Sequence, residues 1–190
     1  MLNQLSPILQ SIDTAPQKCG ATTLITIDGP AGSGKTTLAR EIAAALADSN
    51  RSSATIHMDS LYNGWDDALT STLASTLRKV VLPAFESTPP GEKFSLPYFD
   101  WLINKFGSEE EYVAAHFTIL EGVGAGSQVT RKYSSVALWI EAPLEIALER
   151  VLLRDGFDLE GPMKGFKKAE LTHFTQEGTK AAAHHILHSV

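Results

Sequence analysis

Short hydrophobic runs alternate along this chain with longer segments in which apolar residues recur at helical spacing. The runs that predict strands are residues 22–28, 54–58, 117–120, 136–140 and, more weakly, 186–190. The segments that predict helices are residues 35–46, 66–82, 144–154 and 165–176. Because strands that alternate with helices form parallel sheets covered on both faces, the pattern predicts a three-layer α/β fold.

Capping and breaking residues predict several boundaries. Asp66 is placed to cap the helix over residues 66–82, and Pro83 is expected to end it. Residues 87–93 have the composition of a loop, whereas residues 94–116 fit either extended or helical structure. No repeat or composition shift divides the chain, so residues 1–190 are expected to form one domain. A short N-terminal helix that covers the sheet is predicted by Leu2, Leu5, Leu9 and Ile12.

The most informative motif lies between the first strand and the first long helix. It matches the phosphate-binding pattern G-x-x-x-x-G-K-[ST], or Walker A, with the residues Gly29, Pro30, Ala31, Gly32, Ser33, Gly34, Lys35 and Thr36. Glycines let backbone N–H groups turn toward phosphate oxygens, and the following helix N-terminus favours negative charge. We expect Lys35 to reach the β- and γ-phosphates, Thr36 to ligate Mg²⁺, and Thr37 to belong to the same site. The motif predicts binding of a nucleoside triphosphate.

A carboxylate follows the second strand, at the edge of the sheet where this fold class binds ligands. Asp59 lies in the segment H-M-D-S-L-Y over residues 57–62. It is a candidate base that orients and deprotonates an acceptor hydroxyl, and a candidate Mg²⁺ ligand through water; the alternative is a turn cap. His57 is expected to be a strand residue rather than a catalyst. Tyr62 and Trp65 fit the wall of an acceptor pocket and the hydrophobic core equally well.

A second acidic residue, Glu121, ends the third strand and precedes a glycine-rich segment over residues 122–126. In phosphate-loop folds this position suits a carboxylate near Mg²⁺, so Glu121 joins Thr36 and Asp59 as a candidate metal ligand. Glu121 is also a candidate acceptor ligand. The glycines do not form the dinucleotide fingerprint, because Ser127 holds its third glycine position. A tight turn that lets the backbone approach the phosphates or the acceptor is the simpler interpretation.

Arg150 and Arg154 lie one helical turn apart and therefore share a face of their helix. Guanidinium groups neutralise the charge that spreads over a transferring phosphoryl group, which makes both arginines candidate catalytic residues. The alternative is a solvated helix face on which Glu145 and Glu149 form local pairs. The polar stretch that follows contains glycine and proline and predicts a mobile lid over residues 154–165.

An aromatic and acidic cluster occupies residues 98–101. Stacking on its rings and hydrogen bonds to its carboxylate suit an acceptor, so Tyr98, Asp100 and Trp101 are candidate substrate-binding residues. A hydrophobic plug with one surface carboxylate explains the cluster almost as well. The C-terminal histidines have no cysteine or carboxylate partners at ligand spacing, so no metal site is predicted there.

Composition limits the partners and the compartment. The chain carries 16 Lys and Arg against 22 Asp and Glu, which argues against a nucleic-acid polymer as partner. Cys19 is the only cysteine, which excludes an internal disulfide and fits a reducing cytosol. The chain has no apolar run of membrane-spanning length and no signal-peptide pattern, so we expect a cytoplasmic protein without membrane contact. The sequence allows a homo-oligomer without setting the oligomeric state.

The charge pattern also bears on the reaction. Residues 104–107 lack the Asp that guanine recognition requires, and no D-x-x-G switch is present, which argues against a GTPase. Between Asp59 and Asp100 acidic residues outnumber basic ones. Because a monophosphate acceptor needs arginines to hold its phosphate, this balance favours a neutral, hydroxyl-rich small molecule. Phosphorylation of an alcohol is therefore the expected reaction.

Several segments together resemble the uridine kinase-like and nucleoside and nucleotide kinase-like P-loop proteins. In chain order the similar segments are the opening motif at residues 27–36, the D-x-[FL]-Y segment at 57–62, the Y-D-[FW] segment at 98–101 with Phe99 inserted, and the lid at Arg150, Arg154 and Asp155. Over residues 22–187 the chain is most similar to a compact actinobacterial group whose substrate is not established. It departs from uridine kinases at the lid, which lacks their further arginines, and at Asn104 and Lys105, where those enzymes have a His.

The resemblance implies a kinase that uses ATP and Mg²⁺ and transfers the γ-phosphoryl group to a hydroxyl of a small molecule. It implies that Asp59 is the base and that a nucleoside is the first-choice acceptor. A nucleoside monophosphate or another small metabolite is the alternative within this class. An ATP-binding regulatory protein with slow ATPase activity is the alternative outside it.

Overall fold

The computed structural model describes residues 2–189, and its centre is a five-stranded sheet in the order β2-β5-β1-β6-β7. All neighbouring strands are parallel. The strands are β1 (Thr23–Asp28), β2 (Ser53–His57), β5 (Phe117–Glu121), β6 (Ser134–Glu141) and β7 (His185–His188). The predicted α/β fold with a parallel sheet is confirmed, and the predicted strands differ from these only near their ends. The end of the last predicted strand, residue 190, lies outside the described residues.

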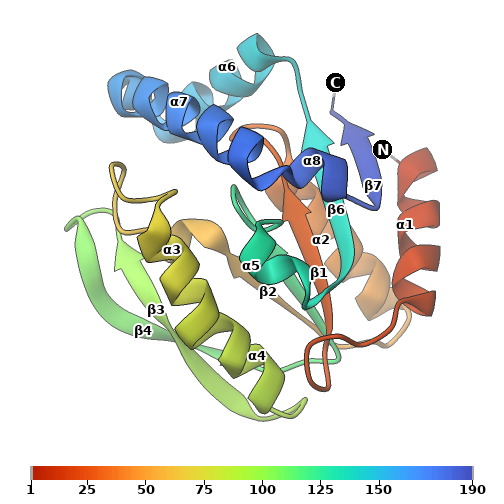
Figure 1. The fold of residues 1–190 in the computed structure, drawn as a ribbon. Helices are drawn as coiled ribbons and strands as arrows, with labels where there is room; N and C mark the ends of the chain where they lie inside the picture. The colour runs from red at the N-terminus through yellow and green to blue at the C-terminus, as the bar shows by residue number, and fades with distance from the viewer. Residues whose placement is uncertain (1, 190) are drawn as a thin grey trace.

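Helices cover both faces of this sheet (Figure 1). Successive residues of β1 point to opposite faces and therefore enter two different hydrophobic clusters. Ile25 and Ile27 pack in the cluster that also contains side chains of α1 (Leu2–Thr14) and α2 (Lys35–Asp48). Leu24 packs in the larger cluster on the other face. The result is the three-layer arrangement that the sequence pattern predicts, and α1 is the predicted N-terminal covering helix.

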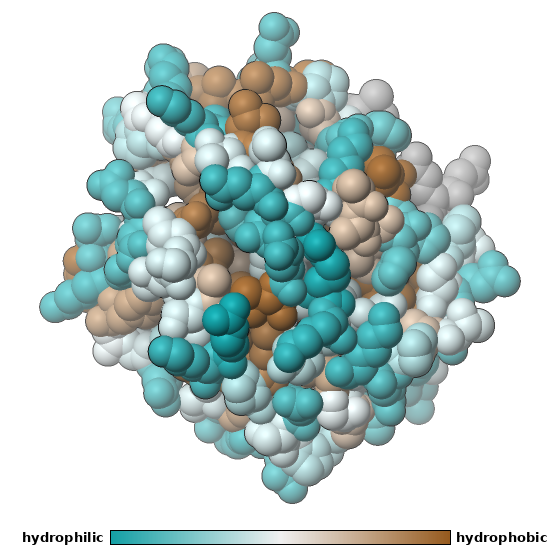
Figure 2. Space-filling model, viewed as in Figure 1, coloured by the Kyte–Doolittle hydropathy of each residue, from teal (hydrophilic) through white to brown (hydrophobic). Residues whose placement is uncertain are grey.

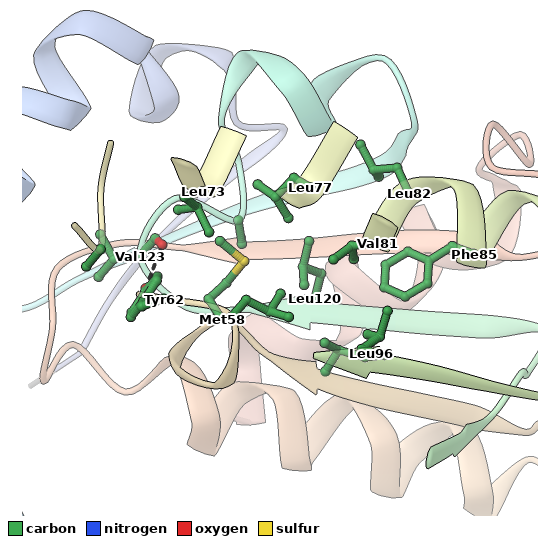
Figure 3. Close-up of a cluster of buried hydrophobic side chains, with 14 of the residues drawn as sticks. Met58, Tyr62, Leu73, Leu77, Val81, Leu82, Phe85, Leu96, Leu120 and Val123 are labelled. Carbon is green, nitrogen blue, oxygen red and sulfur yellow. Dashed lines mark hydrogen bonds between the residues drawn. The ribbon is translucent and has the colours of Figure 1, made fainter. Parts of the chain in front are cut away.

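One helical run closes the larger cluster. It consists of α3 (Ser71–Thr76), the π-helical turn η2 (Leu77–Val81) and α4 (Leu82–Ser87). Its inward side chains lie against the sheet in Figure 3, where the labelled members of the cluster include Leu73, Leu77, Val81, Leu82, Phe85, Leu96 and Leu120. Because this cluster lies directly under the carboxyl ends of β2 and β5, it supports the residues that follow those strands.

Both predicted ends of this helix are wrong. The helix begins after Thr70, whose hydroxyl accepts a hydrogen bond from the N–H of Thr72 and so replaces Asp66 as the cap. Pro83 does not end the run, which continues to Ser87. The π-helical turn has already interrupted the regular ladder, and Pro83 then occupies the first turn of α4, where no N–H donor is needed.

Residues 94–116, whose sequence fits two kinds of structure, fold largely into an antiparallel hairpin of β3 (Lys93–Asp100) and β4 (Lys105–Val113). Leu96 and Phe99 point into the protein and are buried, whereas most of β4 is exposed. The turn of the hairpin carries Trp101, and contacts between β3 and the residues after β2 bring this turn to the carboxyl edge of the sheet.

The C-terminal third forms α5 (Gln128–Arg131), α6 (Leu144–Asp155), the 3-10 turn η3 (Phe157–Leu159), α7 (Glu160–Glu177) and α8 (Thr179–Ala182). In Figure 1, α6 and α7 lie beyond the carboxyl ends of the central strands. The helix α7 begins at Glu160 rather than at residue 165, so most of the segment expected to form a lid is helical. Its mobility stays a prediction.

Three further features bear on the expectations from composition: membrane-spanning helices, the character of the surface and the state of Cys19. Within residues 2–189, no helix is both long enough and apolar enough to cross a membrane. Figure 2 shows one face of the protein that is mainly hydrophilic, with hydrophobic residues in smaller patches between charged ones. Cys19 is free and buried.

We expect Gly122→Ala to lower the free energy of unfolding by about 2–4 kcal/mol. A Cβ at this position would lie 2.4 Å from Cβ of Met58, and the backbone has a φ of +138° that side chains rarely adopt. Gly91→Ala is the matched control, since Gly91 has a φ of +94° but open space around it. Urea denaturation should show a clearly smaller loss for Gly91→Ala. Equal losses would mean that the close approach to Met58 is unimportant.

Candidate active site

The carboxyl ends of β1, β2 and β5 surround a cavity of about 740 Å³. Six residues of the phosphate-loop region line it: Ala31, Gly32, Gly34, Lys35, Thr36 and Thr37. Six further predicted site residues also line it: Asp59, Tyr62, Trp101, Glu121, Arg150 and Arg154. The structure therefore brings most of the predicted site together in one space, although the first and last of these residues, Ala31 and Arg154, are more than a hundred positions apart in sequence.

The remaining loop residues support the site from behind. Gly29, Pro30 and Ser33 do not line the cavity, but the carbonyl oxygens of Gly29 and Pro30 each accept a hydrogen bond of 2.8 Å from Lys35 Nζ. Burial lowers the pKa of Lys35, and the nearby carboxylates, Asp28 first among them, oppose this effect. In this structure the ammonium group is therefore held inside the loop by backbone oxygens.

Two glycines let the loop lie directly against β6 and α6. A Cβ on Gly29 would lie 2.0 Å from the carbonyl oxygen of Ile140, and one on Gly32 would lie 2.0 Å from that of Ala147. No side chain fits at either position, so the motif glycines are required for packing as well as for their backbone conformation.

Asp28, which the sequence analysis did not single out, joins the phosphate loop to the glycine-rich segment after β5. Its carboxylate accepts hydrogen bonds from the N–H groups of Gly29, Gly124 and Gly126 at 2.7, 3.0 and 2.8 Å. Burial raises the pKa of Asp28 to about 6, against the lowering effect of these bonds. The glycine-rich segment is thus a tight turn, as predicted, and its N–H groups at Gly124 and Gly126 bind a protein carboxylate.

Glu121 connects two elements of the site. Its Oε1 accepts a 2.9 Å hydrogen bond from the hydroxyl of Thr36 and lies 2.5 Å from Nδ1 of His57. Although burial acts to raise the pKa of Glu121, these partners and Lys35 lower it below its usual value. The hydrogen bond to Glu121 raises the pKa of His57. His57 is a strand residue, as predicted, but its contact with Glu121 was missed, because the sequence alone does not show which strands are neighbours.

Thr36 and the carboxylates fit a Mg²⁺ ion that is shared with phosphate oxygens. The Thr36 hydroxyl faces the cavity beside Glu121, and hydroxyl, carboxylate and phosphate oxygens are the ligands that Mg²⁺ prefers. Within residues 2–189, no group of three or more His, Cys, Asp or Glu side chains is arranged to hold a metal ion.

Asp59 opens onto the cavity from the 3-10 turn η1 (Met58–Ser60) that follows β2. Asp59 is exposed where it faces the open cavity, and the surrounding protein still desolvates it enough to raise its pKa, while Lys35 acts in the opposite direction. The backbone carbonyl of Asp59 accepts a 3.0 Å hydrogen bond from the indole N–H of Trp101. The hairpin is thereby fastened to the turn that carries the candidate base.

Aromatic rings form a continuous wall beside Asp59. Trp65 lies 5.0 Å from Trp101 and 5.9 Å from Phe166, measured between ring centroids, and Tyr62 lies 6.0 Å from Phe166. All four rings line the cavity. The hydroxyl of Tyr62 donates a 2.7 Å hydrogen bond to the carbonyl of Val123, so it is already paired with the backbone (Figure 3). Tyr62 and Trp65 are therefore both core and pocket residues.

Tyr98 and Asp100, predicted to bind substrate, do not line this cavity. Tyr98 is exposed on β3, where the register with β4 shifts between Tyr98 and Phe99, so that Phe99 rather than Tyr98 takes the buried side with Leu96. The carboxylate of Asp100 accepts the N–H of Leu102 at 2.8 Å and stabilises the hairpin turn. Of this cluster, only Trp101 stands where the prediction placed it.

Arg150 and Arg154 project from α6 into the cavity, as their shared helical face predicts. Arg150 donates a 2.8 Å hydrogen bond to the hydroxyl of Ser189, which is buried next to β7. Arg154 donates two 2.6 Å hydrogen bonds to the carboxylate of Asp155, and these raise the pKa of Arg154 above its usual value. The two guanidinium groups that line the cavity are thus held by acceptors of the chain itself.

Comparison with known proteins shows which solved structures have a similar fold. No protein-family model matches the sequence, and no curated relative matches it either. A solved structure from Bacillus stearothermophilus, described as a possible uridine kinase, has a TM-score of 0.69 at 17% identity, covering 97% of each chain. A candidate fructose transport system kinase from Silicibacter sp. TM1040 has a TM-score of 0.56 at 20% identity, covering 94% of this chain and 89% of its own.

A third similar structure is YFH7 from Saccharomyces cerevisiae, described as a candidate P-loop kinase with a circular permutation. Its TM-score is 0.56 at 11% identity, and the match covers 97% of each chain. At these identities the comparisons establish the fold, which this chain shares with the three solved structures. The resemblance that the motifs suggest is therefore confirmed at the level of the fold.

Asp28 should give the stability of this protein a distinct pH dependence. Its pKa of about 6 in the folded state exceeds the value of about 4 for an unfolded aspartate, so the folded state binds the proton more tightly. Its contribution to stability is therefore present at low pH and is lost as the pH rises from about 4 to about 6. The free energy of unfolding of the wild type, minus that of Asp28→Asn, should fall by up to about 3 kcal/mol across this window.

Urea denaturation at several pH values measures this difference. Asp48→Asn, which changes an exposed carboxylate at the end of α2, is the control. A difference between wild type and Asp28→Asn that stays constant from pH 4 to 7 would contradict the assignment.

Proposed function

We propose that this protein is an ATP- and Mg²⁺-dependent kinase that transfers the γ-phosphoryl group to a hydroxyl group of a small neutral molecule, most simply a nucleoside. The observation that carries the proposal is the position of Asp59 in the same cavity as Lys35 and Thr36. A phosphate loop alone supports nucleotide binding. A partly desolvated carboxylate facing it supplies the acceptor half of a phosphoryl-transfer site.

Each group has a role in the proposed reaction. The loop amides and Lys35 would hold the triphosphate, and Thr36 with Glu121 and Asp59 would hold Mg²⁺, which when bound neutralises charge on the phosphate oxygens. Asp59 would accept the proton of the acceptor hydroxyl. Arg150 and Arg154 would donate hydrogen bonds to the transferring group. The raised pKa of Asp59 brings its basicity closer to that needed for proton transfer near neutral pH.

The aromatic wall supports a planar acceptor. The hydroxyl of Tyr62 and the indole N–H of Trp101 are already engaged with backbone oxygens, so the wall offers ring faces to a bound molecule. Among the described residues that line the cavity, the cations are limited to Lys35, Arg150 and Arg154, on the phosphate loop and α6. This arrangement favours a base or similar ring that stacks, with a free hydroxyl toward Asp59, over a nucleoside monophosphate.

A panel of nucleosides, hexoses and nucleoside monophosphates, incubated with ATP and Mg²⁺, tests the proposed function directly. ADP release above the rate without acceptor is the readout. Stimulation by nucleosides supports the proposal, and stimulation by monophosphates alone would replace it with the alternative within the class. Absence of stimulation by the whole panel would favour the ATP-binding regulatory protein.

Asp59→Asn should reduce kcat for acceptor phosphorylation by about 10²–10⁴-fold, because the base is lost, while ATP affinity changes little. Asp66→Asn, which alters an exposed carboxylate outside the cavity, is the matched control. Steady-state kinetics and ATP titration separate the two effects. Full activity of Asp59→Asn would eliminate Asp59 as the base.

Trp101→Ala should raise KM for the acceptor by about tenfold or more, since stacking of a base on an aromatic ring contributes about 1–3 kcal/mol. KM for ATP should stay nearly constant, because Trp101 belongs to the wall beside Asp59. Tyr98→Ala is a useful comparison, since Tyr98 lies on the same hairpin but does not line the cavity. A larger effect on the acceptor from Tyr98→Ala than from Trp101→Ala would reverse the assignment.

A further inference from the structure

Two charged side chains of α7 bind the backbone of the phosphate loop. Glu170 accepts a 2.7 Å hydrogen bond at Oε2 from the N–H of Ala31. Lys167 donates a 2.8 Å hydrogen bond to the carbonyl oxygen of the same residue. The two side chains also pair with each other, with 3.2 Å between Lys167 Nζ and Glu170 Oε1. Both peptide groups at Ala31 are thus held by one ion pair from a helix more than a hundred residues away.

This ion pair is almost completely buried. The side chains of Lys167 and Glu170 are 12% and 5% exposed. Burying two charges costs several kcal/mol each, and that cost is offset only when both charges are paired and hydrogen-bonded. Apolar side chains would pack there at lower cost. The ion pair instead fixes the position and orientation of the Ala31 backbone, because charge-assisted hydrogen bonds are geometrically specific.

The same stretch of α7 also forms part of the acceptor wall. Met163 and Phe166, within the two turns before Glu170, line the cavity, and Phe166 contacts the rings of Tyr62 and Trp65. Residues three and four apart lie on one side of a helix, so the turns that carry Phe166 and Glu170 move together. The helix therefore touches the nucleotide loop and the acceptor wall through adjacent turns.

We propose that Lys167 and Glu170 are positioning residues that hold α7 against the phosphate loop, so that nucleotide binding and the order of residues 157–166, which form η3 and the first turns of α7, are coupled. The inference rests on the nucleotide-binding half of the proposed function and does not depend on the acceptor. A nucleotide that fixes the loop at Ala31 stabilises the docked position of α7. By linkage, a docked α7 raises nucleotide affinity by the same factor.

Calorimetric titration with MgADP, without any acceptor, tests the first half of the proposal. Glu170→Gln keeps the shape of the side chain but removes its charge, and Lys167→Met removes the other partner. We expect each to weaken MgADP binding by about tenfold, the size of one charge-assisted hydrogen bond. If Glu170→Gln does not fold, Lys167→Met carries the test alone.

Glu177→Gln is the matched control. Glu177 lies on the same helix and accepts a hydrogen bond from the N–H of Gln128, which is outside the phosphate loop. It should leave MgADP affinity within about twofold of the wild type. Wild-type affinity in both Lys167→Met and Glu170→Gln, or an equal loss in Glu177→Gln, would overturn the positioning role and assign the ion pair to general stability.

Hydrogen exchange of the backbone amides provides a second measurement, which would not change if the Lys167–Glu170 ion pair had a purely structural role. In the wild type and in Glu177→Gln, MgADP should slow exchange across residues 157–166. In Lys167→Met and Glu170→Gln this nucleotide-dependent protection should disappear, even at saturating MgADP. Protection that persists in both variants would refute the coupling. If no form binds MgADP, the nucleotide-binding half of the proposed function fails, and this inference fails with it; absence of an active acceptor would leave the inference intact.

Discussion

In a parallel sheet neighbouring strands end at the same edge, and the register of β2, β5 and β1 places His57, Glu121 and Ile27 in one row across that edge. Side chains in register on adjacent parallel strands point to the same side, which is why His57 and Glu121 meet. Asp28, the last residue of β1, and Asp59, which follows β2, are brought to this edge by the same pairing, and Asp59 lines the cavity there. Without this register the motifs of the chain would be separate segments with no common site.

Buried charge holds the site together after the strands have placed it. Asp28 binds N–H groups from two loops, Glu121 binds Thr36 and His57, and Glu170 binds Ala31. In each case a carboxylate takes up backbone or side-chain donors that would otherwise be left without partners in the interior. The phosphate loop is therefore held from several sides by other parts of the chain. Such preorganisation is what phosphoryl transfer requires, because the protein acts mainly by positioning and electrostatics.

The sequence analysis failed where local patterns were overruled by packing. Pro83 would end an isolated helix, but a π-helical turn before it removes the conflict. Tyr98 and Asp100 match a substrate-binding pattern, yet the hairpin directs one to solvent and uses the other in its own turn. The sequence analysis did not single out Lys167 and Glu170. Their role depends on which element α7 packs against, and no short-range pattern in the chain contains that information.

Local patterns in the sequence specify the parallel α/β fold, the phosphate loop from Gly29 to Thr36 and the placement of Asp59 and Glu121 at the carboxyl ends of strands. These features are local: hydrophobic periodicity, glycine content and the order of strand, loop and helix specify them within a few residues. The tertiary structure alone decided the strand order, the aromatic wall around Trp101 and the contacts of Asp28, His57 and Glu170. Those contacts join residues tens to over a hundred positions apart, and they form only when the packed layers bring distant segments within hydrogen-bonding distance.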